Sequence, residues 1–284
     1  MCFSVIFLTF CAQPETDKSP TPKNVKEVSV RDAPPKVPIR FFLASTKKDS
    51  GFRINQNTSD DTLNVLLFLN RVDKKHLLKL DSFVYPDIIV SDFRVYSSFP
   101  QNVSVLDSVK KIIFFSYWFQ SFAVYENGKL QRVGPISMGK KSTPTPTGLF
   151  HTNWKSKSTV STINDEWVMN WYFNLENKLG VSMHEFELPG YPASHACIRL
   201  LQADAFWFYY WADSWKLESS TKIKSLGTPV IIYGEYPFGQ IKPWRRIINN
   251  SLQVNVEEEI EREIKNFIPL ILERQTSLDS LSVK

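Results

Sequence analysis

The stretch IIFFSYWFQSFAVYENGKLQRVGPISM, residues 112–138, decides the fold class of this chain. It holds three runs rich in β-branched and aromatic residues, at 112–117, 121–125 and 130–138. Such residues favour extended strands. Asn127-Gly128, between the second and third runs, is a strong hairpin-turn signal. The sequence therefore predicts an antiparallel sheet that begins at about residue 111.

Further β-like runs follow this stretch, at 148–154, 167–173 and 228–233. The Thr/Pro segment 143–148 is expected to be a rigid loop, because its prolines exclude a helix. The aromatic-rich segment 203–217 is expected to be a helix that begins at Asp204. Residues 111–236 are therefore predicted to form a mainly β (α+β) domain with one prominent helix.

Helical patterns flank this domain on both sides. Residues 39–110 are expected to form a small helical N-terminal module, with helices at 61–70 and 74–80 and with Asp60 or Asp61 as the first cap. Residues 237–284 are expected to form a C-terminal helical extension. Its apolar stripe consists of Val256, Ile260, Ile264 and Phe267. Pro269 is expected to end or kink that helix.

The start of the chain has the pattern of an export signal. Residues 1–10 are an apolar run that is too short to span a bilayer but suits a signal peptide. Residues 1–11 resemble a lipoprotein signal, which predicts a lipid on Cys11 and a membrane anchor, although Phe10 replaces the usual small residue. Residues 12–38 are rich in proline and are expected to be a flexible tether. We therefore expect a periplasmic protein of the cell envelope.

Composition excludes several classes of function. The chain has 284 residues, of which 43% are hydrophobic, enough for one sizeable core. The formal net charge is +5 and the basic residues are scattered, so no nucleic-acid partner is expected. No cofactor or metal is expected, and we expect a monomer.

One thiol stands out as a candidate nucleophile. If the leader is removed and Cys11 carries a lipid, Cys197 is the remaining free thiol among three cysteines. His184 and His195, two of four histidines, lie close to it in the sequence. A thiol becomes a good nucleophile when an imidazole takes its proton. Two alternatives remain open: a buried apolar cysteine, and a zinc site of these three residues, although no HExxH or CxxC motif accompanies them.

The segment SHACIRL, residues 194–200, resembles the signature of the L,D-transpeptidase catalytic-domain family. The usual form of that signature is Ser or Thr, then His-Gly-Cys, then an apolar residue and Asn or Arg. The resemblance extends over residues 111–235. Its other motifs follow in the family's order. Gln120 and residues 125–128 match the opening hairpin, and residues 137–140 and 143–148 match the Ser-x-Gly segment and the Thr-Pro-x-Gly loop. His184 matches the upstream histidine, and residues 227–230 match the closing strand.

The resemblance implies that residues 111–236 form an L,D-transpeptidase-like β-sandwich catalytic domain. It also implies a cysteine transpeptidase that acts on peptidoglycan stem peptides. Cys197 would attack the carbonyl of the third stem residue, expel the terminal D-amino acid and form a thioester. A second stem amine would then form a 3→3 cross-link. His184 would be the base, oriented by a backbone carbonyl, and His195 would hold the substrate or the developing charge.

The resemblance also implies a substrate site, with Gly139, Ser194, Ala196 and Arg199 as its members. Backbone N–H groups around Ala196 and Cys197 would form the oxyanion site. Arg199 would either pair with a stem carboxylate or brace the loop. Ala196 replaces the family's glycine, and its Cβ disfavours a positive φ. The loop 184–194 is short for the family, which would reshape the substrate groove.

Other outcomes of the same chemistry stay open. Water could resolve the thioester, which would give an L,D-carboxypeptidase or related hydrolase, and an envelope protein could be attached instead. A wall-binding lipoprotein with a vestigial site is the non-enzymatic alternative. His76 and His151 are expected to be packing or surface residues. The tryptophans are expected to be mostly core residues, with one or two at the groove: Trp154, Trp167, Trp171, Trp207, Trp211 and Trp215.

Overall fold

The computed structural model describes residues 38–45, 54–55, 57–161, 168–219, 222–249 and 253–282. Contacts group Ala33–Lys284 into one compact unit. The expected signal at 1–11 with Cys11, the tether up to residue 37, and Trp167 lie outside the described residues. None of the described helices is both long enough and apolar enough to cross a membrane.

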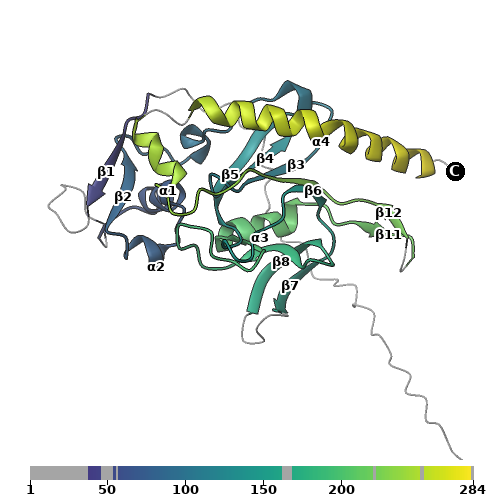
Figure 1. Cartoon of the computed structure of the whole chain (residues 1–284), viewed down its shortest axis with the longest axis horizontal. Helices are drawn as coiled ribbons and strands as arrows, with labels where there is room; N and C mark the ends of the chain where they lie inside the picture. Colours follow the sequence, from purple (N-terminus) through teal and green to yellow (C-terminus); the bar gives the residue numbers. More distant parts are fainter. Residues whose placement is uncertain are drawn as a thin grey trace, which may run out of the picture. The chain divides into compact units, whose positions relative to one another are not determined.

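The described part of the chain is organised around one mixed sheet of nine strands (Figure 1). Their order in the sheet is β6-β13-β3-β4-β5-β10-β9-β8-β7. The predicted mainly β (α+β) fold is confirmed. The strands are β3 (Ile112–Ser116), β4 (Ser121–Glu126), β5 (Lys129–Ser137), β6 (Gly148–His151), β7 (Lys155–Val160), β8 (Val168–Glu176), β9 (Val181–Glu185), β10 (Ile198–Leu200) and β13 (Pro229–Tyr233).

The predicted hairpin forms the centre of the sheet. Strands β3, β4 and β5 pair antiparallel in sequence order. Asn127 and Gly128 both have positive φ, 44° and 73°, as a two-residue hairpin turn of the primed type requires. On its other edge β3 pairs in parallel with β13, which brings the end of the domain back to its beginning.

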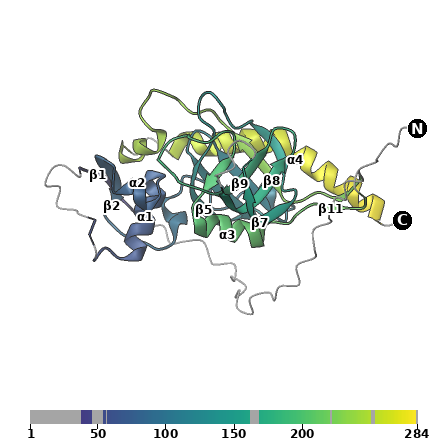
Figure 2. The same cartoon turned by 90° about the horizontal axis from the view of Figure 1, so that it is seen from below.

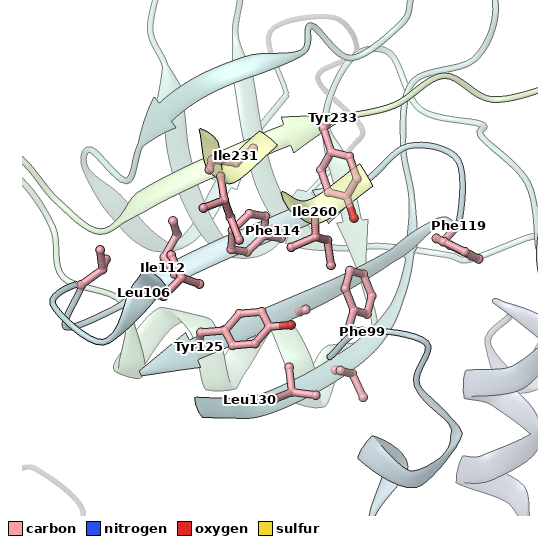
Figure 3. Packing of buried hydrophobic residues seen from close by; sticks show 14 of the residues in the cluster. Phe99, Leu106, Ile112, Phe114, Phe119, Tyr125, Leu130, Ile231, Tyr233 and Ile260 are labelled. Carbon is pink, nitrogen blue, oxygen red and sulfur yellow. The ribbon is translucent and has the colours of Figure 1, made fainter. Parts of the chain in front are cut away.

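The central strands are apolar on both faces, so alternate residues enter two different cores. One core holds Phe114, Tyr125 and Tyr233 (Figure 3). The other core packs the opposite faces, with Phe115 and Phe122, against strands β8 to β10 and against helix α3 (Gln202–Trp211). This second core holds the strands that carry the candidate nucleophile.

Helix α3 is shorter than predicted, because the segment 212–217 leaves the helix and ends in the short strand β11 (Lys216–Leu217). β11 pairs with β12 (Ile223–Ser225). Asp204 was expected to cap α3 but lies within it. Its buried carboxylate accepts hydrogen bonds from the Arg132 guanidinium. The residue at the cap position is Leu201.

The C-terminal helix α4 (Gln253–Ser282) runs through Pro269, so the expected end of the helix at this proline is wrong. The buried residues Ile264 and Ile268 precede the proline and Ile271 follows it, all in the first core. Packing on both sides of Pro269 offsets the lost backbone hydrogen bond. Figures 1 and 2 show this helix in yellow along the sheet. A 3₁₀ segment of seven residues, η3 (Pro243–Asn249), precedes it.

The N-terminal module contains a two-stranded sheet that the sequence did not predict. Strands β1 (Phe41–Ser45) and β2 (Ser82–Pro86) pair antiparallel around helices α1 (Asp60–Asn70) and α2 (Lys74–Leu77). Two short 3₁₀ segments follow, η1 (Phe93–Tyr96) and η2 (Ser104–Leu106).

The ends of these two helices differ from the prediction. Ser59, not Asp60 or Asp61, caps α1, because its hydroxyl accepts the Thr62 N–H. Helix α2 is a single turn that stops at Leu77, since the chain must turn there to enter β2. Arg71 ends α1 in the left-handed conformation, with φ of 59°. Its buried guanidinium donates to the carbonyl of Phe119, which lies between β3 and β4.

Candidate active site

The parallel strands β9 and β10 carry the residues that the sequence singled out. In their register Met183 lies opposite Ile198 and His184 lies opposite Arg199. Side chains alternate along each strand, so one face of the pair is apolar and enters the second core. The other face carries Ser182, His184 and Arg199. Cys197, directly before β10, lies on this polar face, since its Sγ is 3.2 Å from Ser182 Oγ.

These side chains line a small pocket. It has a volume of about 30 Å³, room for one or two water molecules. The pocket brings together the predicted residues Cys197, His184, His195, Ser194 and Arg199. Residues that the sequence did not single out complete the lining: Ser161, Met169 and Phe186.

Cys197 is partly exposed at the pocket but its thiol is largely desolvated. Burial raises the pKa of Cys197, and the hydrogen bond from Ser182 and the charge of Arg199 oppose that rise. Sγ also lies 3.8 Å from the Gly180 carbonyl. The resting thiol therefore keeps its proton at neutral pH.

His184 is buried, with 4% of its surface exposed. Its Nδ1 lies 2.8 Å from the carbonyl of Glu185, and because a carbonyl only accepts, Nδ1 carries the proton. Nε2 is therefore the basic nitrogen. Burial, together with the nearby charge of Arg199, lowers the pKa of His184 to about 4. Tyr172 stacks against the ring at 6.3 Å between centroids.

The sequence suggested a thiolate held by an imidazole, but burial favours a neutral pair in the resting site. Desolvation disfavours both charged forms, so it raises the pKa of Cys197 and lowers that of His184. A proton would then move between them during the attack itself and not before it.

Cationic groups border the pocket. Arg199 is half-buried and its guanidinium lies 4.5 Å from the centre of the Phe186 ring. Lys140 Nζ donates to His195 Nε2 at 2.8 Å, which leaves the ring proton of neutral His195 on Nδ1. Burial, then the charges of Lys140 and Arg199, lower the pKa of His195. The arrangement suits a carboxylate ligand. Lys140 was missed as a site residue, although it ends the quoted motif 137–140.

Hydrogen bonds hold the loop of Ser194 to Cys197 in place. The Ser194 hydroxyl donates to the Cys197 carbonyl, and the Ser194 N–H donates to Met138 O at 3.0 Å. Ala196 adopts φ of 76°, so the chain keeps a backbone shape that favours glycine despite its Cβ. This costs about 1–2 kcal/mol. The structure leaves Ala196 out of the pocket lining.

Gly139 lies beneath this loop and not in the pocket lining. It forms a parallel bridge with Ser194, and the Tyr117 hydroxyl donates to its carbonyl. A Cβ at Gly139 would lie 2.3 Å from the Thr143 carbonyl oxygen, so only glycine fits there. Gly139 therefore joins the 143–148 loop to the loop of Ser194 to Cys197.

The remaining candidates lie away from the pocket lining. His151 is buried in β6, where desolvation and the charge of Arg274 lower its pKa to about 4. His76 pairs with Asp73 in the N-terminal module. Trp207 and Trp211 stack on each other at α3, whereas Trp154 is 40% exposed. No group of three His, Cys, Asp or Glu side chains arranged for a metal occurs among the residues with described positions.

Comparisons with known proteins agree with the sequence motifs. Residues 112–232 match the family model YkuD, the L,D-transpeptidase catalytic domain, which confirms the resemblance. No curated protein was found to match the chain.

Several solved structures are similar to part of the chain. An L,D-transpeptidase 1 from Mycobacterium tuberculosis is 25% identical over 44% of this chain and 62% of that one, with a TM-score of 0.34. An L,D-transpeptidase from Mycobacterium smegmatis is 23% identical over 44% and 59%, with a TM-score of 0.36. One from Stackebrandtia nassauensis is 19% identical over 45% and 57%, with a TM-score of 0.37. This chain thus spans less than two thirds of those chains.

Proposed function

We propose that this chain, whose residues 112–232 match the L,D-transpeptidase catalytic-domain family, is a cysteine-dependent peptidoglycan transpeptidase. The observation that carries the proposal is the pocket in which Cys197, His184 and Arg199 meet. A thiol, a neutral imidazole and a cation in one small pocket are the groups that acyl transfer from an anionic peptide needs.

The first step forms the thioester. Cys197 Sγ attacks the carbonyl carbon of the third stem residue, and its proton passes to His184 Nε2. The S–C bond forms as the carbonyl oxygen becomes an oxyanion, held by backbone N–H groups around Ala196 and Cys197. Collapse breaks the C–N bond to the terminal D-amino acid, whose amine leaves with the proton from His184.

The second step releases the product. The amine of a second stem attacks the thioester carbonyl, and neutral His184 takes its proton. The C–S bond breaks and the sulfur recovers that proton, which regenerates the resting pair. The result is a 3→3 cross-link. Attack by water in place of the amine gives the carboxypeptidase reaction.

The charges around the pocket support an anionic peptide as the substrate. Arg199 and the Lys140–His195 pair lie beside the nucleophile, and they would attract the stem carboxylates. Arg199 also stacks on Phe186, so its guanidinium is held in a fixed plane.

The proposal extends to location. A peptidoglycan substrate requires a protein of the cell envelope, and the leader pattern favours the periplasm with a lipid on Cys11. We expect the mature protein to be a monomer. Mass determination of the N-terminus from cells tests the anchor, since a soluble N-terminus downstream of Cys11 would contradict it.

Intact-protein mass spectrometry with a tetrapeptide stem tests the reaction. We expect an adduct on Cys197 equal to the stem without its terminal D-amino acid, and no adduct in Cys197→Ala. A tripeptide stem added as acceptor should then yield a 3→3 dimer. Release of free tripeptide alone would favour the hydrolase. Absence of any adduct on a folded protein would favour the vestigial wall-binding alternative.

A further inference from the structure

The corner between α1 and α2 contacts the loop that follows β9, which leads from His184 to Ser194. Asp73 N donates to the Leu188 carbonyl at 3.0 Å, and Leu188 N donates to Asp73 Oδ2 at 2.8 Å. The neighbouring residues Val72 and Pro189 form an antiparallel bridge. A residue of the N-terminal module therefore binds both backbone groups of a residue in the active-site loop.

Both carboxylate oxygens of Asp73 have hydrogen-bond partners. Its Oδ1 accepts the His76 N–H at 2.8 Å and so caps α2, while Oδ2 accepts the Leu188 N–H. His76 Nδ1 lies 2.9 Å from both oxygens. One carboxylate thus ends a helix on one side and holds a loop on the other.

The loop approaches the corner too closely for a side chain at position 190. Gly190 has φ of 80°, and a Cβ there would lie 2.9 Å from Val72 Cγ1. Leu188 and Val72 are both fully buried at this contact. The position of the loop is therefore set by direct packing as well as by hydrogen bonds.

This loop continues directly from the catalytic strand. The carbonyl that orients His184 belongs to Glu185, and the next residue, Phe186, carries Arg199 on its ring. Phe186 N donates to Leu200 O at 3.1 Å. Leu188 is separated from Phe186 by one residue, so the position of the loop at Leu188 bears directly on the ring under Arg199 and, through it, on the end of β9 behind His184.

We infer that Asp73 is a positioning residue, through which the N-terminal module holds the active-site loop so that His184 and Arg199 face Cys197. The expected effect on the rate of Cys197 acylation rests on the proposed function. Misplacement of catalytic groups by about 1 Å can cost on the order of a hundredfold in rate.

A second contact between the same elements serves as a contrast. Lys75 and Glu187 form an ion pair whose side chains are 59% and 51% exposed. Exposed pairs contribute little because water and salt screen them. The inference assigns the positioning to Asp73 and not to this pair, so Lys75→Ala should leave the acylation rate unchanged.

The variant Asp73→Asn tests the inference. It leaves one acceptor oxygen where the carboxylate has two, so the side chain cannot accept both the His76 N–H and the Leu188 N–H. We expect Cys197 acylation by a tetrapeptide stem to slow by about tenfold or more. Amide hydrogen exchange at Leu188 should become faster. Ser59→Ala is the matched control, since it removes the cap of α1 in the same module without touching the loop.

Three results would overturn the inference. One is an unchanged acylation rate in Asp73→Asn despite faster exchange at Leu188, and another is unchanged exchange. The third is an equal slowing in Ser59→Ala, which would indicate general destabilisation. If Asp73→Asn does not fold, Asp73→Ser replaces it, because serine can cap α2 but is too short to reach Leu188.

The proposed function can fail separately. If the wild-type protein forms no acyl adduct, the rate of Cys197 alkylation by iodoacetamide as a function of pH replaces the acylation rate. Asp73→Asn should then shift that pH profile, because His184 and Arg199 no longer face the thiol in the same way. An unshifted profile would overturn the inference on its own.

Discussion

The two faces of the β9–β10 pair share one backbone and differ in almost every other respect. The face toward the second core carries Val181, Met183, Ile198 and Leu200, none more than 1% exposed. The opposite face carries Ser182, His184 and Arg199, with Cys197 at its edge. Alternation along the strands is sufficient to separate them.

The difference shows how one pair of strands supplies both a buried apolar face and a face of polar, titratable side chains. Each large apolar side chain on the core face contributes about 1.5–3 kcal/mol by its burial. On the site face, partial burial shifts the pKa of His184 down and that of Cys197 up, which costs stability when either group must ionise. Changes on the two faces should therefore separate into effects on folding and effects on rate.

The largest expected effect is that of His184→Gln on the site face. Loss of the base should reduce the rate of acyl-enzyme formation by about 10²–10⁴-fold, measured by rapid-quench mass spectrometry with a tetrapeptide stem. The thermal midpoint at pH 8 should hardly change. A near-normal acylation rate would contradict the assignment of His184 as base.

On the core face, Ile198→Ala should lower the stability of the folded protein. We expect the free energy of unfolding to fall by about 2–5 kcal/mol in urea titration, because the side chain is fully buried and leaves a cavity. Ile198→Val is the milder control, at about 0.5–1.5 kcal/mol. A loss of activity in Ile198→Val without a loss of stability would mean that the faces are not independent.

Acid should destabilise the protein through its buried histidines. The pKa of His184 is lowered to about 4, so the unfolded chain binds a proton below about pH 6.5 that the folded protein does not. Stability is therefore complete above pH 6.5 and falls by about 3 kcal/mol as the pH drops to 4.

Urea titrations between pH 8 and pH 4 measure this loss. His184→Gln should remove the part of the pH dependence of the free energy of unfolding that His184 contributes. His151, whose pKa is also lowered to about 4, gives a matched control outside the site, and His151→Gln should remove a similar share. An unchanged slope in both variants would contradict the burial of neutral imidazoles.

The smallest expected effect is that of Ala196→Gly, next to Cys197. Glycine adopts φ of 76° without a Cβ conflict, so the free energy of unfolding should rise by about 1 kcal/mol. The greater freedom of glycine in the unfolded chain opposes this gain. Destabilisation in calorimetry would show that the Cβ of Ala196 contributes packing that outweighs the strain.

Local signals in the sequence predicted the central part of the fold. The hairpin at Asn127-Gly128 and the run 112–117 were identified because turn chemistry and strand propensity are properties of neighbouring residues. The nucleophile segment 194–200 was recognised by its motif. Most of the expected site residues line its pocket in the structure, whereas Gly139 and Ala196 lie outside the lining, and the roles of all of them stay predictions.

The remaining features depend on tertiary contacts. Strands β9 and β10 have only five and three residues and were not predicted, so Ser182 was missed with them. Helix α4 continues through Pro269 because the core on both sides holds it. The contact of Asp73 with Leu188 joins residues far apart in the chain, and no local pattern in the sequence could indicate it.

The buried guanidinium of Arg71 bears on whether the chain can be truncated without loss of folding. It donates to the Phe119 carbonyl, and desolvation lowers its pKa to about 9. A fragment that begins at residue 111 would lack Arg71 and Asp73. The Phe119 carbonyl and the Leu188 backbone would then lose their hydrogen-bond partners, and the apolar surfaces that the N-terminal module covers would be exposed to water. We therefore expect the family-matched segment, residues 112–232, to be poorly soluble when it is produced without the rest of the chain.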